Sequence, residues 1–402
     1  MEGVKRVLLA TAAATTACVF PVFLLGGMAV QVRADLGFSE AGTGLGVAAF
    51  FATASLFSAV AGRWAEGMGG DRALRLATLW SAAVQLAVAV LTGSLPVLLV
   101  LLALAGTANA LAQPAANLVI SRALPLGRQG LGFAVKQSAI PASTMLAGLA
   151  VPAVALTVGW RWAFVGSALL SLVSAATVPV ATGAERRAPA DDSFEGPGRA
   201  PMGTMAMLSL GIALGAAAAG TLGAFLVTSG VEAGLAPGTA GLTLTLGSAV
   251  GITVRLLAGL RADRRRGGHL RVVALMLALG SVAFALFATG RPGVIVAAVP
   301  LAFGAGWAWP GLFNLAVVLA NPGSPAAATG ITQTGTYLGA VAGPLAFGFL
   351  AEHTSFAVAW LVAAAAAAGA SAAIWTGRAM LRRSRLVTAG AVPLEPIPPL
   401  PA

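Results

Sequence analysis

Residues 96–120 read PVLLVLLALAGTANALAQPAANLVI, a run of 25 residues that contains no charged side chain. The hydrocarbon core of a bilayer is about 30 Å thick, and a helix needs roughly 20 apolar residues to cross it. Lipid-embedded backbone must satisfy its own hydrogen bonds, and this run is far longer than a barrel strand of about 10 residues. The stretch therefore predicts a membrane-spanning helix.

Runs of this kind recur along the chain of 402 residues, of which 58% are apolar and 9% are charged. Soluble globular domains carry about 25% charged residues, so this composition excludes an ordinary water-soluble globule. We expect an all-α integral membrane protein with twelve transmembrane helices, arranged as two pseudo-symmetric six-helix bundles. The predicted spans are 7–31, 43–62, 74–93, 96–120, 131–157, 162–182, 204–229, 239–260, 272–289, 293–319, 326–350 and 356–376.

A polar segment rich in Pro and Gly, residues 183–203, separates the sixth predicted span from the seventh. This composition is typical of a flexible linker. We therefore expect an N-terminal bundle over 1–182, a cytoplasmic linker, and a C-terminal bundle over 204–376. The basic and Pro-rich residues 377–402 predict a disordered cytoplasmic tail.

Basic residues predict the orientation of the spans, because cytoplasmic loops carry an excess of Lys and Arg. With the N-terminus inside, the inner segments hold 19 basic residues, and the outer loops hold only Arg33, Arg161 and Arg291. We expect a multi-pass protein of the plasma (inner) membrane with both termini in the cytoplasm. The net charge of +11 follows from this bias and does not indicate nucleic-acid binding.

The two halves of the chain repeat each other. Residues of matching type recur at an offset of 196 or 197 in two unrelated features, an inner loop and a pair of intramembrane side chains. Equal offsets in unrelated features indicate a duplicated six-helix unit. The matching positions are Gly62 and Gly259, Glu66 and Asp263, Pro114 and Pro310, and Gln137 and Gln333.

The second inner loop has the pattern Gly-x-x-x-Asp-Arg at Gly259, Asp263 and Arg264. Together with twelve spans and a mid-chain linker, this pattern resembles the major facilitator superfamily. More narrowly, residues 108–141 and the GWRWAF stretch at 159–164 are similar to the cyanate and nitroimidazole transporter-like branch of that superfamily. The resemblance implies a secondary transporter that works by alternating access and is not an enzyme.

The resemblance also implies a gate at the inner loops. A carboxylate there can pair with arginines or lie favourably at a helix start, and such pairs would hold the inner side closed. The alternative is that these charges are ordinary solvated loop residues. Arg255 lies eight residues before Asp263, and we expect it to snorkel to the inner surface or to pair with that carboxylate. The gating candidates are Gly62, Glu66, Gly69, Arg72, Arg255, Gly259, Asp263 and Arg264.

Lys136, like Arg255, lies well inside a predicted span, and no Asp or Glu falls within any of the spans. A charge in hydrocarbon costs at least about 2.5 kcal/mol, so its position calls for a reason. Gln137 follows it, and the preceding span carries Asn109, Gln113 and Asn117 four residues apart, on one helix face. Such a polar face must meet other helices or water. It forms either a substrate-binding wall or interhelical hydrogen bonds.

The second half carries a similar set of candidates at mid-span. Trp307, Asn314, Gln333 and Tyr337 are the predicted substrate contacts there, with plain helix packing as the alternative. The eleventh span also carries glycines four residues apart, which allow helices to approach closely, followed by a proline that weakens the backbone ladder. The predicted bending residues are Pro141, Gly343 and Pro344.

These observations predict a transporter of a small solute. If Lys136 faces the cavity, the solute is a small organic or inorganic anion. The alternative is efflux of a neutral or amphipathic compound, and a non-transporting membrane sensor or structural protein is a remote third choice. The two histidines lie on opposite membrane faces in this arrangement, so we expect no metal site, no cofactor and no catalytic residue. The expected partners are a small-molecule substrate and the lipid bilayer, with no nucleic acid, and the protein is expected to function as a monomer.

Overall fold

The computed structural model describes residues 2–123, 132, 135–178, 200–263, 267–321 and 325–390, and within these ranges every element is a helix. The first half comprises α1 (Glu2–Gly27), α2 (Ala29–Leu36), α3 (Glu40–Met68), α4 (Gly70–Leu91), α5 (Leu95–Ala123), α7 (Ala139–Ala150), the π-helical η2 (Val151–Ala155) and α8 (Trp160–Thr177). The second half comprises α9 (Met202–Glu232), α10 (Pro237–Asp263), α11 (His269–Phe287), α12 (Pro292–Leu301), the π-helical η3 (Ala302–Trp307), α13 (Pro310–Ala320), α14 (Pro325–His353) and α15 (Phe356–Gly390).

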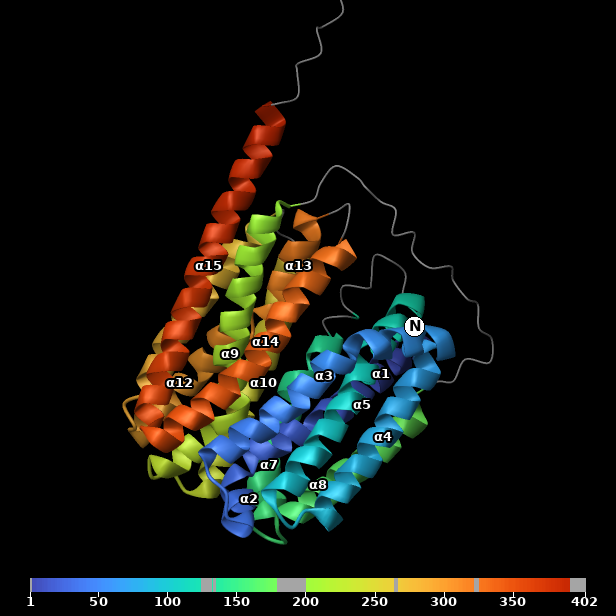
Figure 1. The fold of residues 1–402 in the computed structure, drawn as a ribbon, viewed down its shortest axis with the longest axis vertical. Helices are drawn as coiled ribbons and strands as arrows, with labels where there is room; N and C mark the ends of the chain where they lie inside the picture. Colours follow the sequence, from blue (N-terminus) through green and yellow to red (C-terminus); the bar gives the residue numbers. More distant parts are fainter. Residues whose placement is uncertain are drawn as a thin grey trace, which may run out of the picture.

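The two halves form separate bundles that lie side by side (Figure 1). Within the described residues, eleven helical segments are long and apolar enough to cross a membrane. The 18-residue helix α8 occupies the place of the remaining predicted span. The predicted all-α, two-bundle architecture is confirmed.

Two details differ from the expected boundaries. Helix α15 continues to Gly390, so residues 377–390 are helical and the prediction of disorder there is wrong. Apart from one glycine at each end, this segment holds no helix breaker, which explains why the helix continues. The tenth predicted span is not one helix but the series α12, η3 and α13, with Pro310 opening α13. Residues 391–402 and most of the expected linker lie outside the described residues.

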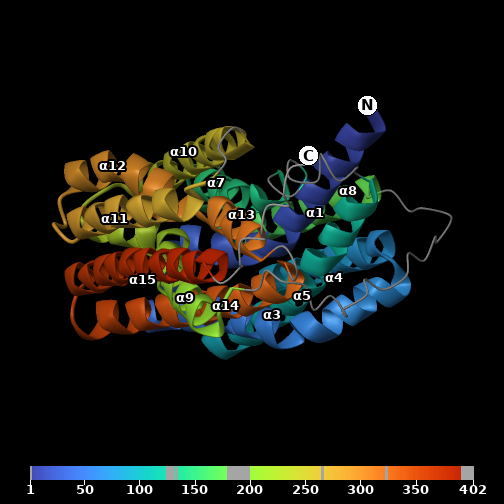
Figure 2. The same cartoon turned by 90° about the horizontal axis from the view of Figure 1, so that it is seen from above.

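The beginning of α1 and the end of α15 lie at the same end of the molecule (Figure 1). We call this end the terminal side and the opposite end the far side. The halves contact each other mainly through α3 with α14, α7 with α10, and α1 with α9, and Figure 2 shows α7 beside α10. Toward the terminal side the ribbons of the two halves diverge (Figure 1).

Glycines set the spacing at these contacts. A Cβ atom on Gly148 of α7 would lie 2.5 Å from the carbonyl oxygen of Gly241 in α10, and one on Gly44 of α3 would lie 2.5 Å from that of Pro344 in α14. Real side chains do not approach backbone this closely, so the two halves pack through bare backbone. This close approach places polar groups of α7 and α10 within hydrogen-bond distance across the interface.

Candidate functional site

Lys136 lies in the short helical stretch before α7 and is only 6% exposed. Its Nζ donates to Oδ1 of Asn117 at 2.8 Å and to the carbonyl oxygen of Gln113 at 3.3 Å. The Gln113 side-chain amide in turn donates to Oδ1 of Asn109 at 3.1 Å. The structure thus brings together the predicted amide face of α5 and Lys136. Every acceptor of the ammonium group in these bonds is neutral, so its charge has no counter-ion there.

Arg255 of α10 reaches across to the first half. Its Nη1 donates to the carbonyl oxygen of Gln137 at 3.1 Å, and its Nη2 donates to that of Trp307 at 2.6 Å. Its Nε is buried and has no hydrogen-bond partner among the described residues. Two backbone carbonyls therefore hold the Arg255 guanidinium between the halves, away from the inner surface to which it was expected to snorkel. Its pairing with Asp263 stays a prediction, because the Asp263 side chain lies outside the described residues.

Breaks in the helices explain why these carbonyls are free. In a helix the carbonyl of Gln137 would accept the backbone N–H four residues later, but that residue is Pro141, which has no N–H. Trp307 ends η3, and its carbonyl lies at the break before α13 begins at Pro310. Both carbonyls therefore remain available to Arg255. Pro141, predicted as a bending residue, acts here by leaving an acceptor open.

The bonds from α10 to the first half follow one another along the helix. The Thr245 hydroxyl donates to the Met145 carbonyl at 3.3 Å, and the hydroxyls of Ser248 and Thr144 lie 2.7 Å apart. Arg255 is the next residue of α10 toward the terminal side that bonds to the first half. By helical rise it lies about 12 Å from the end of α10. Lys136 precedes Gln137 in sequence, and Arg255 binds the Gln137 carbonyl, so both cations lie beside Gln137.

The two central tryptophans differ in their surroundings. The ring of Trp307 is 8% exposed and lies 6.0 Å from Phe23 of the first half and 5.5 Å from Phe303, centroid to centroid. The ring of Trp309 packs against Phe313, and its indole N–H donates to the Gly306 carbonyl at 2.9 Å. Trp307 thus lies at the interface between the halves, whereas Trp309 belongs to the core of the second half.

The other predicted contacts in the second half are not joined to this network. Asn314 on α13 and Tyr337 on α14 are partly buried, and Gln333 on α14 is exposed. The hydrogen bonds of the described residues do not connect these three side chains to Lys136 or Arg255. Their role in substrate binding stays a prediction.

The described gating candidates of the inner loops lie at the terminal side, at the ends of α3 and α10 and the start of α4. Glu66 and Arg72 are exposed, Gly62 and Gly259 are half-buried, and Gly69 joins α3 to α4 with a positive φ of 91°. The side chain of Asp263 and the whole of Arg264 lie outside the described residues. Gating by these residues stays a prediction.

The sequence interpretation missed a contact between the two halves at the far side. Oε2 of Glu352 in α14 accepts hydrogen bonds from the Ser39 hydroxyl at 2.6 Å and from the Ala41 backbone N–H at 3.1 Å. A carboxylate from the second half thus lies at the start of α3 in the first half, where a helix favours negative charge. The sequence signal for this contact was Glu352 itself, an isolated acidic residue at the end of a predicted span.

Gly335, Gly339 and Gly343, which we call the glycine stripe of α14, have a packing role. A Cβ atom on Gly335, Gly339 or Gly343 would overlap the carbonyl of Ser209, Ala213 or Ala217 respectively, three residues spaced four apart on α9. Pro344 lies inside a helix that runs without interruption from Pro325 to His353. Bending at Gly343 and Pro344 stays a prediction.

Comparisons with known proteins agree with this architecture. The model of the Major Facilitator Superfamily matches residues 8–344. The inward open structure of the xylose transporter XylE from E. coli is similar with a TM-score of 0.74 at 13% identity, covering 92% of this chain and 95% of that chain. The inward-facing and occupied structure of a bacterial homologue of the human lysosomal transporter Spinster has a TM-score of 0.71 at 16% identity, with coverage of 96% and 98%.

The nucleoside transporter NupG is similar with a TM-score of 0.70 at 15% identity, covering 95% of this chain and 100% of that chain. No curated protein matches the chain in sequence. At these identities the solved structures show the shared fold, and the substrate has to be argued from the site.

Proposed function

Because the chain belongs to the Major Facilitator Superfamily, whose model matches residues 8–344, we propose that it is a secondary transporter that carries a small anion by alternating access. The site lies between the two bundles, around Lys136, Gln137 and Arg255. The substrate would bind there from the terminal side, and rocking of the bundles would then expose it to the far side.

The proposal is carried by one observation: the hydrogen bonds of two cationic side chains go only to neutral acceptors. Lys136 bonds to a side-chain amide and a carbonyl, and Arg255 bonds to two carbonyls. A buried charge without a counter-ion is unfavourable, and removal from water makes its attraction for an anion stronger. The predicted spans hold no Asp or Glu that would supply this counter-ion. A small anion from solution would supply the missing negative charge.

The neighbouring groups fit an anion with hydrogen-bond acceptors. The unpartnered Nε of Arg255 is a further donor, and the amide of Asn117, which is exposed, lies beside the Lys136 ammonium. A carboxylate or a small inorganic oxyanion accepts several such bonds at once. The likeness of residues 108–141 to the cyanate and nitroimidazole transporter-like branch agrees with this class, because cyanate is an anion.

The alternative, efflux of a neutral or amphipathic compound, depended on aromatic side chains at mid-span. Trp309 is 1% exposed within the core of the second half, and Trp307 packs against Phe23 and Phe303. These contacts account for both rings without a ligand. We therefore favour an anion, and we place the transporter in the plasma membrane as a monomer with cytoplasmic termini.

Proteoliposomes test the proposal directly. Uptake of formate, acetate, nitrate and cyanate is compared with uptake of formamide and acetamide, which have similar shapes to the two carboxylates but no charge. We expect saturable uptake of at least one anion and none of the neutral compounds. Saturable uptake of a neutral compound without any uptake of the anions would contradict the proposal.

A further inference from the structure

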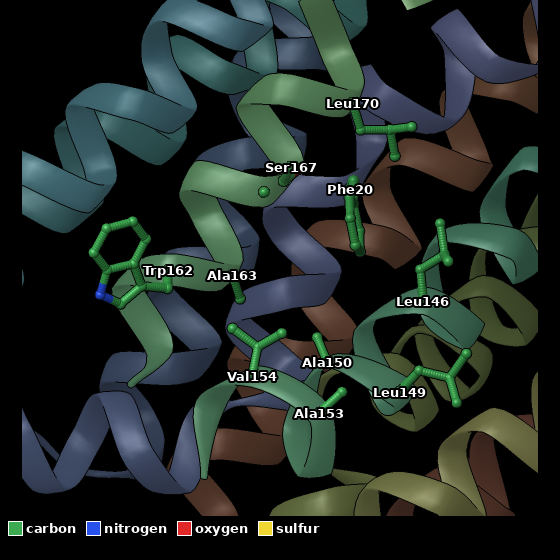
Figure 3. Close-up of a pocket in the computed structure, with 11 residues that line it drawn as sticks. Phe20, Leu146, Leu149, Ala150, Ala153, Val154, Trp162, Ala163, Ser167 and Leu170 are labelled. Atoms are coloured by element: carbon green, nitrogen blue, oxygen red, sulfur yellow. The ribbon is translucent and has the colours of Figure 1, made fainter. Parts of the chain in front are cut away.

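Two cavities adjoin on the far half of the first bundle, and Trp162 lines both of them. One is an apolar groove of about 280 Å³ between α1, the α7–η2 segment and α8 (Figure 3). The other, of about 270 Å³, is lined by Asp35, Gly159, Trp160 and Arg161 among others. An apolar groove and a charged cavity thus meet at one side chain, at the depth where a span ends.

The groove is apolar along its whole length. Its one hydroxyl-bearing residue, Ser167, donates its hydroxyl to Oε1 of Gln85 in the bundle interior and so turns it away from the groove. A Cβ atom on Gly166 would meet nothing within 4 Å, so this glycine leaves open space in the groove. Leu149 and Trp162 are 41% and 59% exposed. In a membrane this surface faces hydrocarbon.

The charged cavity presents both signs of charge. Nη1 of Arg161 lies 2.5 Å from Oδ2 of Asp35, and the Trp160 indole N–H donates to the same oxygen at 3.1 Å. Both bonds go to Oδ2, so Oδ1 is open to a further donor. Arg161 also donates to the Thr92 carbonyl at 2.9 Å and lies 4.4 Å above the Trp160 ring. The side chains of Arg161 and Asp35 remain 41% and 44% exposed.

We propose that the two cavities form one binding site for a phospholipid of the far leaflet whose headgroup carries a phosphate and a primary ammonium group. One acyl chain lies in the groove over Gly166. The phosphate accepts hydrogen bonds from the exposed edge of the Arg161 guanidinium, and the ammonium group donates to Oδ1 of Asp35. This site is separate from the transport pathway and does not depend on the identity of the substrate.

The charges select this headgroup over two others. A headgroup with a net negative charge and no cation brings its phosphate close to Asp35 without compensation. A trimethylammonium headgroup has no N–H to donate to Oδ1. Phosphatidylethanolamine satisfies both groups, whereas phosphatidylglycerol and phosphatidylcholine each satisfy one.

Native mass spectrometry of the full chain in detergent tests the proposal with palmitoyl-oleoyl phosphatidylethanolamine, phosphatidylglycerol and phosphatidylcholine added separately. We expect one tightly held copy of phosphatidylethanolamine, bound at least about 10-fold more tightly than the other two lipids.

Gly166→Phe fills the groove and should remove this copy. Gly293→Phe is the matched control, because Gly293 is exposed at the start of α12 and also has open space around it. Asp35→Asn should abolish the preference for phosphatidylethanolamine over phosphatidylcholine.

A second readout does not depend on the groove variant. Phosphatidylethanolamine with a brominated acyl chain should quench the tryptophan fluorescence of the wild-type protein more than that of Trp162→Phe. Equal affinity for the three lipids, or equal quenching in wild type and Trp162→Phe, would overturn the proposal.

Discussion

The guanidinium of Arg255 donates to the carbonyl of Gln137, a backbone acceptor of the opposite half that Pro141 leaves without a helical partner. The same guanidinium donates to the Trp307 carbonyl in its own half. One cation thereby joins the two bundles through neutral acceptors. An anion that entered the site would compete with these carbonyls for Arg255, because hydrogen bonds between opposite charges are stronger. Substrate binding would therefore loosen a contact between the bundles.

Replacing Arg255 tests this connection. We expect Arg255→Lys to lower the maximal rate of anion uptake, because lysine keeps the charge but lacks the planar fork that reaches two carbonyls. A hydrogen bond to a charged group contributes about 1.5–3 kcal/mol, which corresponds to a reduction of about 10- to 100-fold. Initial rates in proteoliposomes measure the effect, with Arg261→Lys, an exposed position on the same helix, as the control. Wild-type rates in Arg255→Lys would exclude a role for the fork.

The contact of Glu352 with Ser39 and Ala41 predicts a change in the balance between conformations. Glu352→Gln removes the negative charge at the start of α3, so the far side should open more often. Spin labels at Thr157→Cys and Thr289→Cys, both exposed at the far side in different halves, should show a larger share of long distances. Glu232→Gln, an exposed glutamate at the end of α9, serves as control. The native Cys18 is buried and is replaced by alanine for this measurement. Identical distance distributions in Glu352→Gln and wild type would contradict the assignment.

The glycine stripe of α14 predicts opposite effects for the same substitution. Gly339→Ala places a methyl group against the Ala213 carbonyl of α9, and overpacking of this kind costs about 1–3 kcal/mol. Gly330→Ala on the same helix meets open space, and replacing a helical glycine by alanine there should be neutral or stabilising by about 0.5–1 kcal/mol. Thermal unfolding in detergent should therefore give a lower Tm for Gly339→Ala than for Gly330→Ala. Equal Tm values would contradict this prediction, because they would mean that α14 and α9 move apart at no cost in free energy.

The Asp35–Arg161 pair predicts a pH dependence of stability at the far side. Hydrogen bonds from Arg161, and then from Trp160, hold the pKa of the Asp35 carboxyl below its ordinary value of 3.8. A carboxylate with a lowered pKa stabilises the folded state fully above its ordinary pKa, and this contribution is lost as the pH falls through the folded-state pKa. The difference in Tm between wild type and Asp35→Asn should be constant from about pH 7 to pH 5 and should narrow below about pH 4. A difference that grew on acidification would contradict this pairing.

Part of this account could be predicted from the sequence because it depends on local spacing. The four-residue spacing of Asn109, Gln113 and Asn117 places them on one helix face, and the cost of burying Lys136 predicts polar partners for it. The spacing of Gly335, Gly339 and Gly343 likewise predicts a close helix contact, which the structure places against α9. Twelve spans and their approximate positions follow from hydropathy alone.

The positions of Arg255 and Glu352 could not be predicted in the same way. Their partners, Gln137 and Ser39, lie 118 and 313 residues away in sequence, and only the packing of the two halves brings them together. The free carbonyl of Gln137 was visible in principle, because Pro141 follows it by four residues. Which side chain would use that carbonyl depends on the crossing of α7 and α10, and that crossing depends on glycines whose partners are equally distant in sequence.

The most direct test of anion transport uses the two lysines of the chain. Lys136 is buried in the site, whereas Lys5 is exposed near the start of α1 and provides a matched control. In proteoliposomes, Lys136→Ala should reduce saturable anion uptake by about 10- to 100-fold, Lys136→Arg should retain part of it, and Lys5→Ala should match wild type. Anion uptake by Lys136→Ala at the wild-type rate and affinity would contradict the claim that this buried cation binds the substrate.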